Sequence, residues 1–309
     1  VSGAHEQNFP EPMRIQRLAP QVSDKIAAGE VVERPAAVVK ELVENAIDAG
    51  ASRIVVEVEQ GGKKYIRVTD NGSGMNPEDV PLAFERHATS KVAAIEDLVS
   101  LRTLGFRGEA LSSIAAVSYL ELTSRRHRDE EGLHITLAGG RETDRRATSA
   151  AQGTTVVVKD LFFNTPARLK FMKSSTSEAA YITDLMTKLA LSHPELSFQF
   201  ILDKRLVFKT PGDGKVFSAA YATLERSMSR SLIEFSFENE LARVTGWASK
   251  LDYTRGNRNY QMTFVNGRYV KSRMILDAIQ YAYQGLLPSG RFPAVLIYLE
   301  IQPDACDVN

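Results

Sequence analysis

Cysteine is almost absent from this chain of 309 residues, whose single example is Cys306. One cysteine excludes an internal disulfide framework. Because the chain also has no clustered pairs of cysteine or histidine, it excludes a structural zinc site. A composition of this kind fits a reducing, cytosolic environment.

Neither an excess of charge nor a long apolar run is present. Lys plus Arg and Asp plus Glu number 38 each, so no global field attracts nucleic acid or an acidic membrane, and polyanion binding requires local patches. No apolar run approaches the roughly 18 residues of a membrane span. Residues 1–12 lack the apolar core of a signal peptide, and we interpret them as a flexible leader or an expression remnant.

The two common nucleotide-binding fingerprints are also missing. No segment supplies the phosphate loop G-x-x-x-x-G-K-[ST] or the dinucleotide pattern G-x-G-x-x-G, which disfavours the usual nucleotide folds. With 43% hydrophobic and 25% charged residues, the composition is typical of a globular protein. The length exceeds that of one usual core, so we expect two domains.

The most informative stretch is 35–50, which predicts a short amphipathic helix. Pro35 suits a first helical turn, and Gly50 suits the residue just past the end. At about 100° per residue, one arc of this helix is polar and the opposite side is apolar. The polar arc contains Glu41, Glu44, Asn45 and Asp48. A solvated polar face is the alternative interpretation.

A hairpin with strands at 53–59 and 65–70 follows, and it ends at Asp70 in the sequence D-N-G-S-G. A carboxylate at a strand end can accept a hydrogen bond from the exocyclic amine of adenine. The glycines at 72 and 74 permit positive φ and let a flat ligand approach the backbone. An Asx turn between strand and helix is the alternative. The pattern is not an EF-hand.

Two later segments suit phosphate groups. After a helix predicted over 76–87, Thr89, Ser90 and Lys91 place two hydroxyls and an ammonium in a row, although such tripeptides also occur as solvated loop. Residues 104–111 form a glycine-rich loop that runs into a helix predicted over 109–117. The N-terminal amides of that helix predict an anion site.

The remaining strands complete two α/β units. We expect strands at 119–123, 133–137, 154–158, 197–202 and 205–209, charged loops at 125–131 and 139–146, and a helix at 178–191. They predict a mostly antiparallel sheet covered by helices on one face. Upstream, 15–18 reads as an edge strand and 24–28 as a brief helix. Residues 210–214 are the best linker candidate.

Beyond the linker we expect a helix, strands at 233–237, 242–248, 260–265 and 294–301, and a helix at 272–284. Basic and aromatic residues alternate in this part, and such a surface can bind a nucleic-acid backbone, although a solvated charged face fits equally well. The basic residues are Arg255, Arg258, Arg268, Lys271 and Arg273.

The order of these motifs resembles that of the GHKL ATPases, the superfamily of DNA gyrase, the Hsp90 chaperones, histidine kinases and MutL. Within it, four segments are similar to the MutL family of DNA mismatch-repair proteins, and the resemblance runs from about Gln16 to the last residue. These segments are I-A-A-G-E-V-V-E-R-P (26–35), K-E-L-V-E-N-A-I-D-A-G (40–50), G-F-R-G-E-A-L (105–111) and F-V-N-G-R (264–268).

The resemblance implies an α/β (α+β) fold: a Bergerat-type α/β sandwich of the GHKL class over 13–210, then a smaller α/β domain over 211–309 that resembles ribosomal protein S5 domain 2. It implies slow, Mg²⁺-dependent ATP hydrolysis that closes a lid and pairs two copies into a homodimer. This cycle would regulate engagement of DNA and of mismatch-recognition and downstream repair proteins, in the cytoplasm at the nucleoid and away from membranes. The alternatives are a type II topoisomerase, an Hsp90-like chaperone or a non-catalytic ATP-binding scaffold.

The resemblance also assigns residue roles. Glu41 would be the general base for the attacking water, Asn45 would bind Mg²⁺, and Asp70 would recognise adenine with help from Thr154. Glu44 receives no role beyond a solvated residue or a supporting partner. The other residues expected to bind ATP are Asp48, Gly74, Thr89, Ser90, Lys91, Gly105, Phe106, Arg107, Gly108, Glu109 and Ala110.

In the family, the pattern continues past the last residue of this chain, Asn309, into a V-H-P-x-K segment whose lysine reaches the γ-phosphate. We therefore expect this chain to be a fragment that also lacks a C-terminal dimerisation domain. We expect it to bind ATP but to hydrolyse ATP more slowly than a longer chain that includes this lysine.

Overall fold

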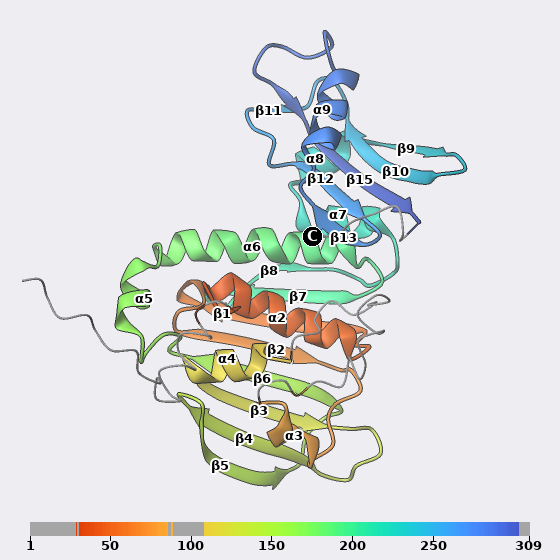
Figure 1. The fold of residues 1–309 in the computed structure, drawn as a ribbon. Helices are drawn as coiled ribbons and strands as arrows, with labels where there is room; N and C mark the ends of the chain where they lie inside the picture. Colours follow the sequence, from red (N-terminus) through yellow and green to blue (C-terminus); the bar gives the residue numbers. More distant parts are fainter. Residues whose placement is uncertain (1–28, 30, 86–87, 89–107, 303–309) are drawn as a thin grey trace, which may run out of the picture.

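The computed structural model describes residues 29, 31–85, 88 and 108–302. They form two lobes, each with one large β-sheet, and helix α6 (Ser175–Ser192) lies between them (Figure 1); the second lobe also contains a small two-stranded sheet. The predictions for residues 15–18, 24–28 and 89–107 lie outside the described residues.

The first lobe contains an eight-stranded sheet in the order β5-β4-β3-β6-β2-β1-β7-β8. All neighbouring strands are antiparallel except β1 and β7, which are parallel, so the predicted mostly antiparallel sheet is confirmed. The strands are β1 (Arg53–Glu59), β2 (Tyr65–Asp70), β3 (Tyr119–Arg125), β4 (Gly132–Ala138), β5 (Arg141–Thr148), β6 (Gly153–Lys159), β7 (Ser197–Leu202) and β8 (Arg205–Lys209).

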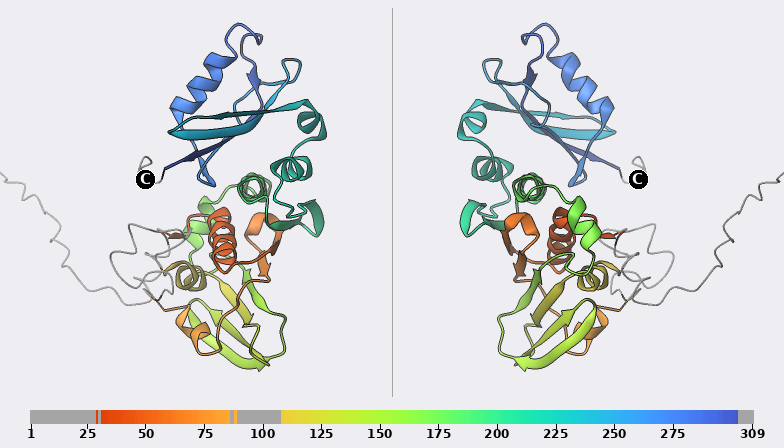
Figure 2. Two further views of the ribbon diagram at one scale, coloured as in Figure 1. Left: turned by 90° about the vertical axis from the view of Figure 1, so that its right-hand side faces the viewer. Right: turned by 90° about the vertical axis from the view of Figure 1, so that its left-hand side faces the viewer.

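Helices cover one face of this sheet (Figure 2). The face contains α2 (Pro35–Asp48), α4 (Ala110–Ala116) and α6, and a 3₁₀ turn, η1 (Gln60–Gly62), joins β1 to β2. On the opposite face, cross-strand ion pairs such as Arg67–Glu57 at 3.2 Å replace apolar contacts. Alternation along each strand therefore separates an apolar, helix-covered side from a polar side.

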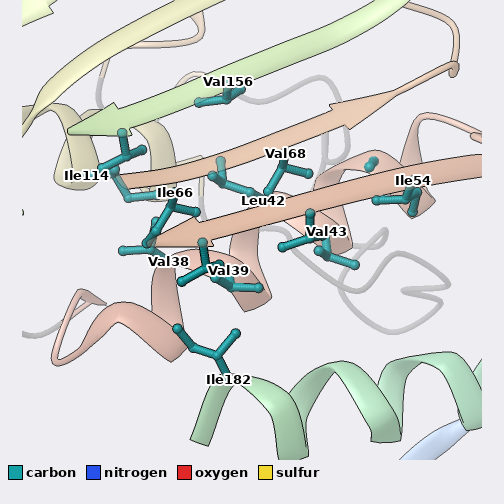
Figure 3. Packing of buried hydrophobic residues seen from close by; sticks show 14 of the residues in the cluster. Val38, Val39, Leu42, Val43, Ile54, Ile66, Val68, Ile114, Val156 and Ile182 are labelled. Carbon is teal, nitrogen blue, oxygen red and sulfur yellow. The ribbon is translucent and has the colours of Figure 1, made fainter. Parts of the chain in front are cut away.

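Helix α2 forms where the sequence predicts it. Pro35 occupies the first turn, and Gly50 follows the end of the helix with φ of 69°. Val38, Val39 and Val43 are fully buried and point toward the strands, as Figure 3 shows. This apolar stripe holds α2 against β1 and β2.

Two predicted elements of the first lobe are wrong. The helix predicted over 76–87 is, in its described part, only α3 (Asp79–Leu82), because the Phe84 and Glu85 amides bond to carbonyls three residues back and so do not continue the α-helical pattern. The charged loop predicted over 139–146 is instead the edge strand β5, in which all but the last residue is exposed. After α5 (Pro166–Phe171), α6 begins earlier than predicted because Ser174 caps it, accepting from the Ser177 N–H.

The second lobe contains a five-stranded sheet in the order β13-β12-β15-β10-β9. Here β12 and β15 are parallel and the other pairs are antiparallel. The elements are α7 (Val216–Thr223), α8 (Arg226–Ser231), β9 (Leu232–Glu238), β10 (Ala242–Ser249), β11 (Thr254–Arg255), β12 (Gln261–Val265), β13 (Arg268–Val270), α9 (Arg273–Ala282), β14 (Phe292–Pro293) and β15 (Val295–Ile301).

The C-terminal end of α6 joins the two lobes. Leu191 is fully buried in the core of the second lobe, together with Phe264 and Leu296. The Tyr298 hydroxyl donates to the Leu191 carbonyl at 2.9 Å, and the Lys188 ammonium lies 4.3 Å from the centre of the Tyr269 ring. One helix therefore contributes side chains to both cores.

Among the residues that the structure describes, no helix is long and apolar enough to span a membrane.

Candidate functional site

The polar arc of α2 is not uniformly solvated. Glu41, Asn45 and Asp48 are half-buried, whereas Glu44 is only 8% exposed. The interpretation of Glu44 as a solvated residue is therefore wrong, while that of a supporting partner stays a prediction.

Lys40 compensates for the burial of Glu44. Its ammonium lies 2.9 Å from Glu44 Oε2, one helical turn away, and 3.8 Å from Glu41 Oε1. Burial raises the pKa of the Glu44 carboxyl, and the hydrogen bond from Lys40 opposes that rise. Three charged groups on α2 thus share one cluster.

Asp70 ends β2 and faces the start of β6. Its Oδ1 accepts hydrogen bonds from the backbone N–H of Gly72 at 2.8 Å and of Thr154 at 3.3 Å. Burial nevertheless raises the pKa of this carboxyl, because the two amides only partly replace the lost water. Within the described part of the chain, Asp70 Oδ2 has no hydrogen-bond partner, which leaves it available to a ligand.

The loop after Asp70 is tied to the C-terminal end of α2. The Ser73 N–H donates to the Ala49 carbonyl at 2.9 Å, and Asn71 Oδ1 accepts from the Ser52 and Arg53 amides at 2.9 and 2.8 Å. These bonds hold the Asp70 carboxyl next to the helix that carries Glu41 and Asn45. The Asx turn is therefore present, and it also positions the carboxylate.

Gly74 has a structural reason to be glycine. Its φ is 69°, and a Cβ there would lie 2.1 Å from the carbonyl oxygen of Arg125. The close approach at this position is thus to the backbone of β3. Gly153 is similar, with φ of 112° and a hypothetical Cβ 2.1 Å from the Asp70 carbonyl oxygen.

Ser124 is a residue that the sequence reasoning missed. It is fully buried, and its hydroxyl lies 2.9 Å from Thr154 Oγ1 while it accepts a hydrogen bond from the Met75 N–H at 2.8 Å. Ser124 therefore links the glycine loop to the strand beside Asp70. A small hydroxyl residue inside a strand gives no signal in the sequence that could have identified it.

Of the predicted lid, the structure describes only the last part. Gly108 has φ of 63°, Glu109 precedes α4 and accepts from the Ser113 N–H at 3.0 Å, and Ala110 begins that helix. Since α4 packs on α2, these three residues lie on the helix-covered side of the sheet. Thr89, Ser90, Lys91, Gly105, Phe106 and Arg107 lie outside the described residues.

The basic residues of the second lobe fall into two groups. Arg255 and Arg258 lie on and after β11, at the end of the lobe away from α6, whereas Arg268, Lys271 and Arg273 lie on and after β13, which contacts α6 (Figure 1).

The first group is engaged within the protein. Arg255 pairs with Glu225 at 2.6 Å and lies 4.5 Å from the centre of the Tyr260 ring, and the Arg258 guanidinium lies 5.0 Å from that of Phe292. In the second group the Arg273 side chain is 95% exposed, and its Nε lies 3.8 Å from Asp277 Oδ2, one turn along α9.

No cluster of three or more His, Cys, Asp or Glu residues suited to a metal ion occurs in the described ranges. Mg²⁺ does not require such a cluster, because it is commonly bound through one or two protein ligands together with phosphates and water.

Two family models match the chain. Residues 30–161 match the model described as histidine kinase-, DNA gyrase B- and HSP90-like ATPase, and residues 220–309 match that of the DNA mismatch repair protein, C-terminal domain. The first covers α2, Asp70 and Thr154, and the second covers the sheet of the second lobe.

Similar proteins agree with these matches. DNA mismatch repair protein MutL of Symbiobacterium thermophilum is 49% identical over 96% of this chain and 47% of its own length. That of Halothermothrix orenii is 46% identical over 96% of this chain and 46% of its own length. The chain thus spans about half the length of the curated relatives it matches.

Solved structures share the fold. The Aquifex aeolicus MutL ATPase domain complexed with ADP is 29% identical, with a TM-score of 0.65 over 88% of this chain and 94% of that chain. The N-terminal domain of a DNA repair protein is 27% identical, with a TM-score of 0.76 over 90% of this chain and 86% of that chain. Together with the motif order and the geometry at α2 and Asp70, these matches show that the chain belongs to the MutL family of DNA mismatch-repair proteins and contains a GHKL-type ATPase fold.

Proposed function

We propose that this chain binds ATP and hydrolyses it slowly in the presence of Mg²⁺. The observation that carries the proposal is the fixed position of Asp70 beside the C-terminal end of α2, the helix whose polar arc presents Glu41 and Asn45 one turn apart. The solved MutL ATPase domain with ADP supports the same assignment.

Asp70 would recognise the adenine base. Its Oδ1 is engaged by two backbone amides, so its Oδ2 can accept a hydrogen bond from the exocyclic amine, which guanine does not offer in that place. Thr154 holds Asp70 through its own N–H, and Gly74 keeps the loop close to β3. Asp48 would contact the nucleotide through water.

Glu41 would accept a proton from the water that attacks the γ-phosphate. Its carboxylate is partly exposed at 28%, so both water and substrate can reach it. A positioned general base typically contributes about 10² to 10⁴ in rate. Asn45, at i+4, would offer its amide oxygen to Mg²⁺, which when bound would neutralise charge on the phosphates.

The remaining assignments rest on the family. Thr89, Ser90 and Lys91 and the segment from Gly105 to Ala110 would close over the phosphates. Residues 13–210 would act as the ATPase domain and 211–309 as a second domain that transmits its state. ATP-driven pairing of two copies would control contact with DNA and with other repair proteins, in the cytoplasm at the nucleoid. A topoisomerase or chaperone is disfavoured because residues 220–309 match a mismatch-repair model.

An ATPase assay of the wild type beside Glu41→Ala and Asn45→Ala tests the proposal. We expect Glu41→Ala to bind ATP but to lose at least about 10²-fold in turnover, because the base is gone. We expect Asn45→Ala to lose Mg²⁺-dependent binding. Unchanged turnover in both variants would show that the site lies elsewhere, and a wild type that binds but never hydrolyses would favour the scaffold.

We also propose that the second lobe binds the DNA backbone near β13 rather than near β11. Lys271 is exposed there, and the Arg273 side chain is 95% exposed although it lies 3.8 Å from Asp277, whereas the Arg255 side chain is 25% exposed and pairs with Glu225 at 2.6 Å. Arg268→Glu should weaken DNA binding, lower its salt dependence by a slope of about one, and leave ATP affinity intact. Arg258→Glu serves as the comparison, and a larger effect from that variant would move the surface to the other end of the lobe.

A further inference from the structure

Lys40 lies between two carboxylates of α2 that differ in their surroundings. Its ammonium is 2.9 Å from Glu44 Oε2 and 3.8 Å from Glu41 Oε1. The Glu44 side chain is 10% exposed and that of Glu41 is 28% exposed. Across residues 31–85 and 108–302, no other Lys or Arg forms an ion pair with either carboxylate.

The burial of Glu44 decides which carboxylate the ammonium prefers. A carboxylate that is withdrawn from water is stable only when it is paired, whereas the more exposed Glu41 keeps part of its hydration. The Lys40 ammonium donates to Glu44 Oε2 at 2.9 Å, whereas its distance of 3.8 Å from Glu41 Oε1 is too long for a hydrogen bond. Lys40 is therefore held at Glu44 although Glu41 is within reach.

We propose that Lys40 and Glu44 are positioning residues for Glu41: Glu44 retains the Lys40 ammonium and so prevents it from closing onto the Glu41 carboxylate. An ammonium in direct contact with Glu41 would make that carboxylate a weaker base and would occupy the position of the attacking water. This inference rests on the role of Glu41 in the proposed ATPase.

A second lysine–carboxylate pair with the same spacing has different surroundings. Lys188 and Asp184 are also spaced i, i+4, on α6, but the Asp184 side chain is 53% exposed, and in the described residues no second carboxylate pairs with Lys188. The Lys40 cluster differs from the Lys188–Asp184 pair in two ways. Its acceptor, Glu44, is buried, and a second carboxylate, that of Glu41, lies next to the ammonium. Asp184→Asn is thus a matched control for loss of an i, i+4 pair.

The test measures kcat and KM for ATP in the whole chain carrying Glu44→Gln, Glu44→Gln together with Lys40→Met, or Asp184→Asn. In Glu44→Gln the ammonium is released toward Glu41, so we expect kcat to fall about tenfold or more, with the loss of the whole contribution of a general base, about 10² to 10⁴, as the upper limit. KM should change by less than about threefold, because the nucleotide contacts are intact. Asp184→Asn should leave both constants unchanged.

The double variant gives the decisive result. Without the ammonium, Glu41 has no competing partner, so Lys40→Met in the Glu44→Gln background should restore kcat to within about threefold of the wild type. Lys40→Met alone would leave the buried Glu44 carboxylate unpaired, so only the double variant, in which residue 44 is neutral, is compared with the wild type. A double variant as slow as Glu44→Gln would overturn the inference. If the wild type hydrolyses ATP and needs Glu41 while Glu44→Gln is fully active, the inference fails and the proposed function stands. If Glu41→Ala is as active as the wild type, the proposed function itself fails.

Discussion

The Asp70 carboxylate is held by hydrogen bonds in a place where burial disfavours its charge. Two backbone amides bind its Oδ1, yet burial keeps the pKa of the carboxyl raised. Ionised Asp70 therefore opposes folding, as expected for a group kept for ligand recognition and not for stability. Stability and nucleotide binding should then respond in opposite directions when this charge is removed.

Asp70→Asn tests this. The amide oxygen can still accept both backbone hydrogen bonds, but the NH₂ group would face the adenine amine with a donor instead of an acceptor, so ATP affinity should fall at least tenfold. The free energy of unfolding at neutral pH should be equal to or above that of the wild type. Calorimetry of ATP binding and thermal unfolding measure the two effects. Retained affinity would remove Asp70 from base recognition.

The same substitution predicts a pH dependence. A raised folded pKa means that the contribution of Asp70 to stability is fully present below the ordinary carboxyl range and is lost as pH rises through the folded pKa. From about pH 4 upward, the stability of the wild type should therefore fall relative to Asp70→Asn. Parallel denaturant titrations at several pH values check this, and a constant difference would contradict it.

At the scale of elements, the glycine loop is fixed by contact with β3. Gly74 and Gly50 share φ of 69°, but a Cβ at Gly74 would lie 2.1 Å from the Arg125 carbonyl oxygen, whereas nothing lies within 4 Å at Gly50. Gly50→Ala should therefore lower the free energy of unfolding by about 1 kcal/mol, because only the positive φ is unfavourable for alanine there. The loss of unfolding free energy in Gly74→Ala should be larger than that in Gly50→Ala by at least about 1–2 kcal/mol, because the added methyl also clashes with β3. Equal losses in denaturant unfolding would contradict the close approach.

Much of the first lobe could be predicted from local pattern. Alternation predicts β1 and β2 to the residue, and the Pro35 and Gly50 signals mark the two ends of α2. The motif order also brought Glu41, Asn45, Asp70 and Thr154 together as one candidate site, and the structure places Asp70 and Thr154 in hydrogen-bond contact.

What could not be predicted depends on contacts distant in sequence. Strand β5 lacks an apolar side because it lies at a sheet edge with both faces exposed, so its charges indicated a loop. The burial of Glu44 and the contacts of Ser124 arise only when other elements pack around them. The separation of Arg255 from Arg268 follows from sheet order, which a one-dimensional pattern does not contain.

At the scale of the whole molecule, helix α6 connects the hydrophobic cores of the two lobes. Leu189 belongs to the core of the first lobe and Leu191, two residues later, to that of the second. The only tryptophan, Trp247, lies on β10 in the second lobe, so its fluorescence reports on that lobe, while circular dichroism reports on both.

Leu191→Ala should therefore separate the Trp247 fluorescence transition from the circular dichroism transition, which should coincide in the wild type. Removing this buried side chain should destabilise the second lobe by about 2–4 kcal/mol, and the Trp247 transition should shift to lower denaturant than the circular dichroism transition. Leu189→Ala is the matched control on the same helix, and it should not shift the Trp247 signal ahead of the dichroism. Coincident transitions in Leu191→Ala would mean that the lobes unfold as one unit regardless of this contact.

The charged edge strand β5 has a consequence for association. A terminal strand exposes a row of backbone donors and acceptors that can pair with the edge of another chain. Along β5, Arg141, Glu142, Asp144, Arg145 and Arg146 are exposed, and Arg145 pairs with Glu142 while Arg146 pairs with Asp144. An approaching strand would have to desolvate these ion pairs, so the composition that resembles a loop also protects this sheet against edge-to-edge aggregation.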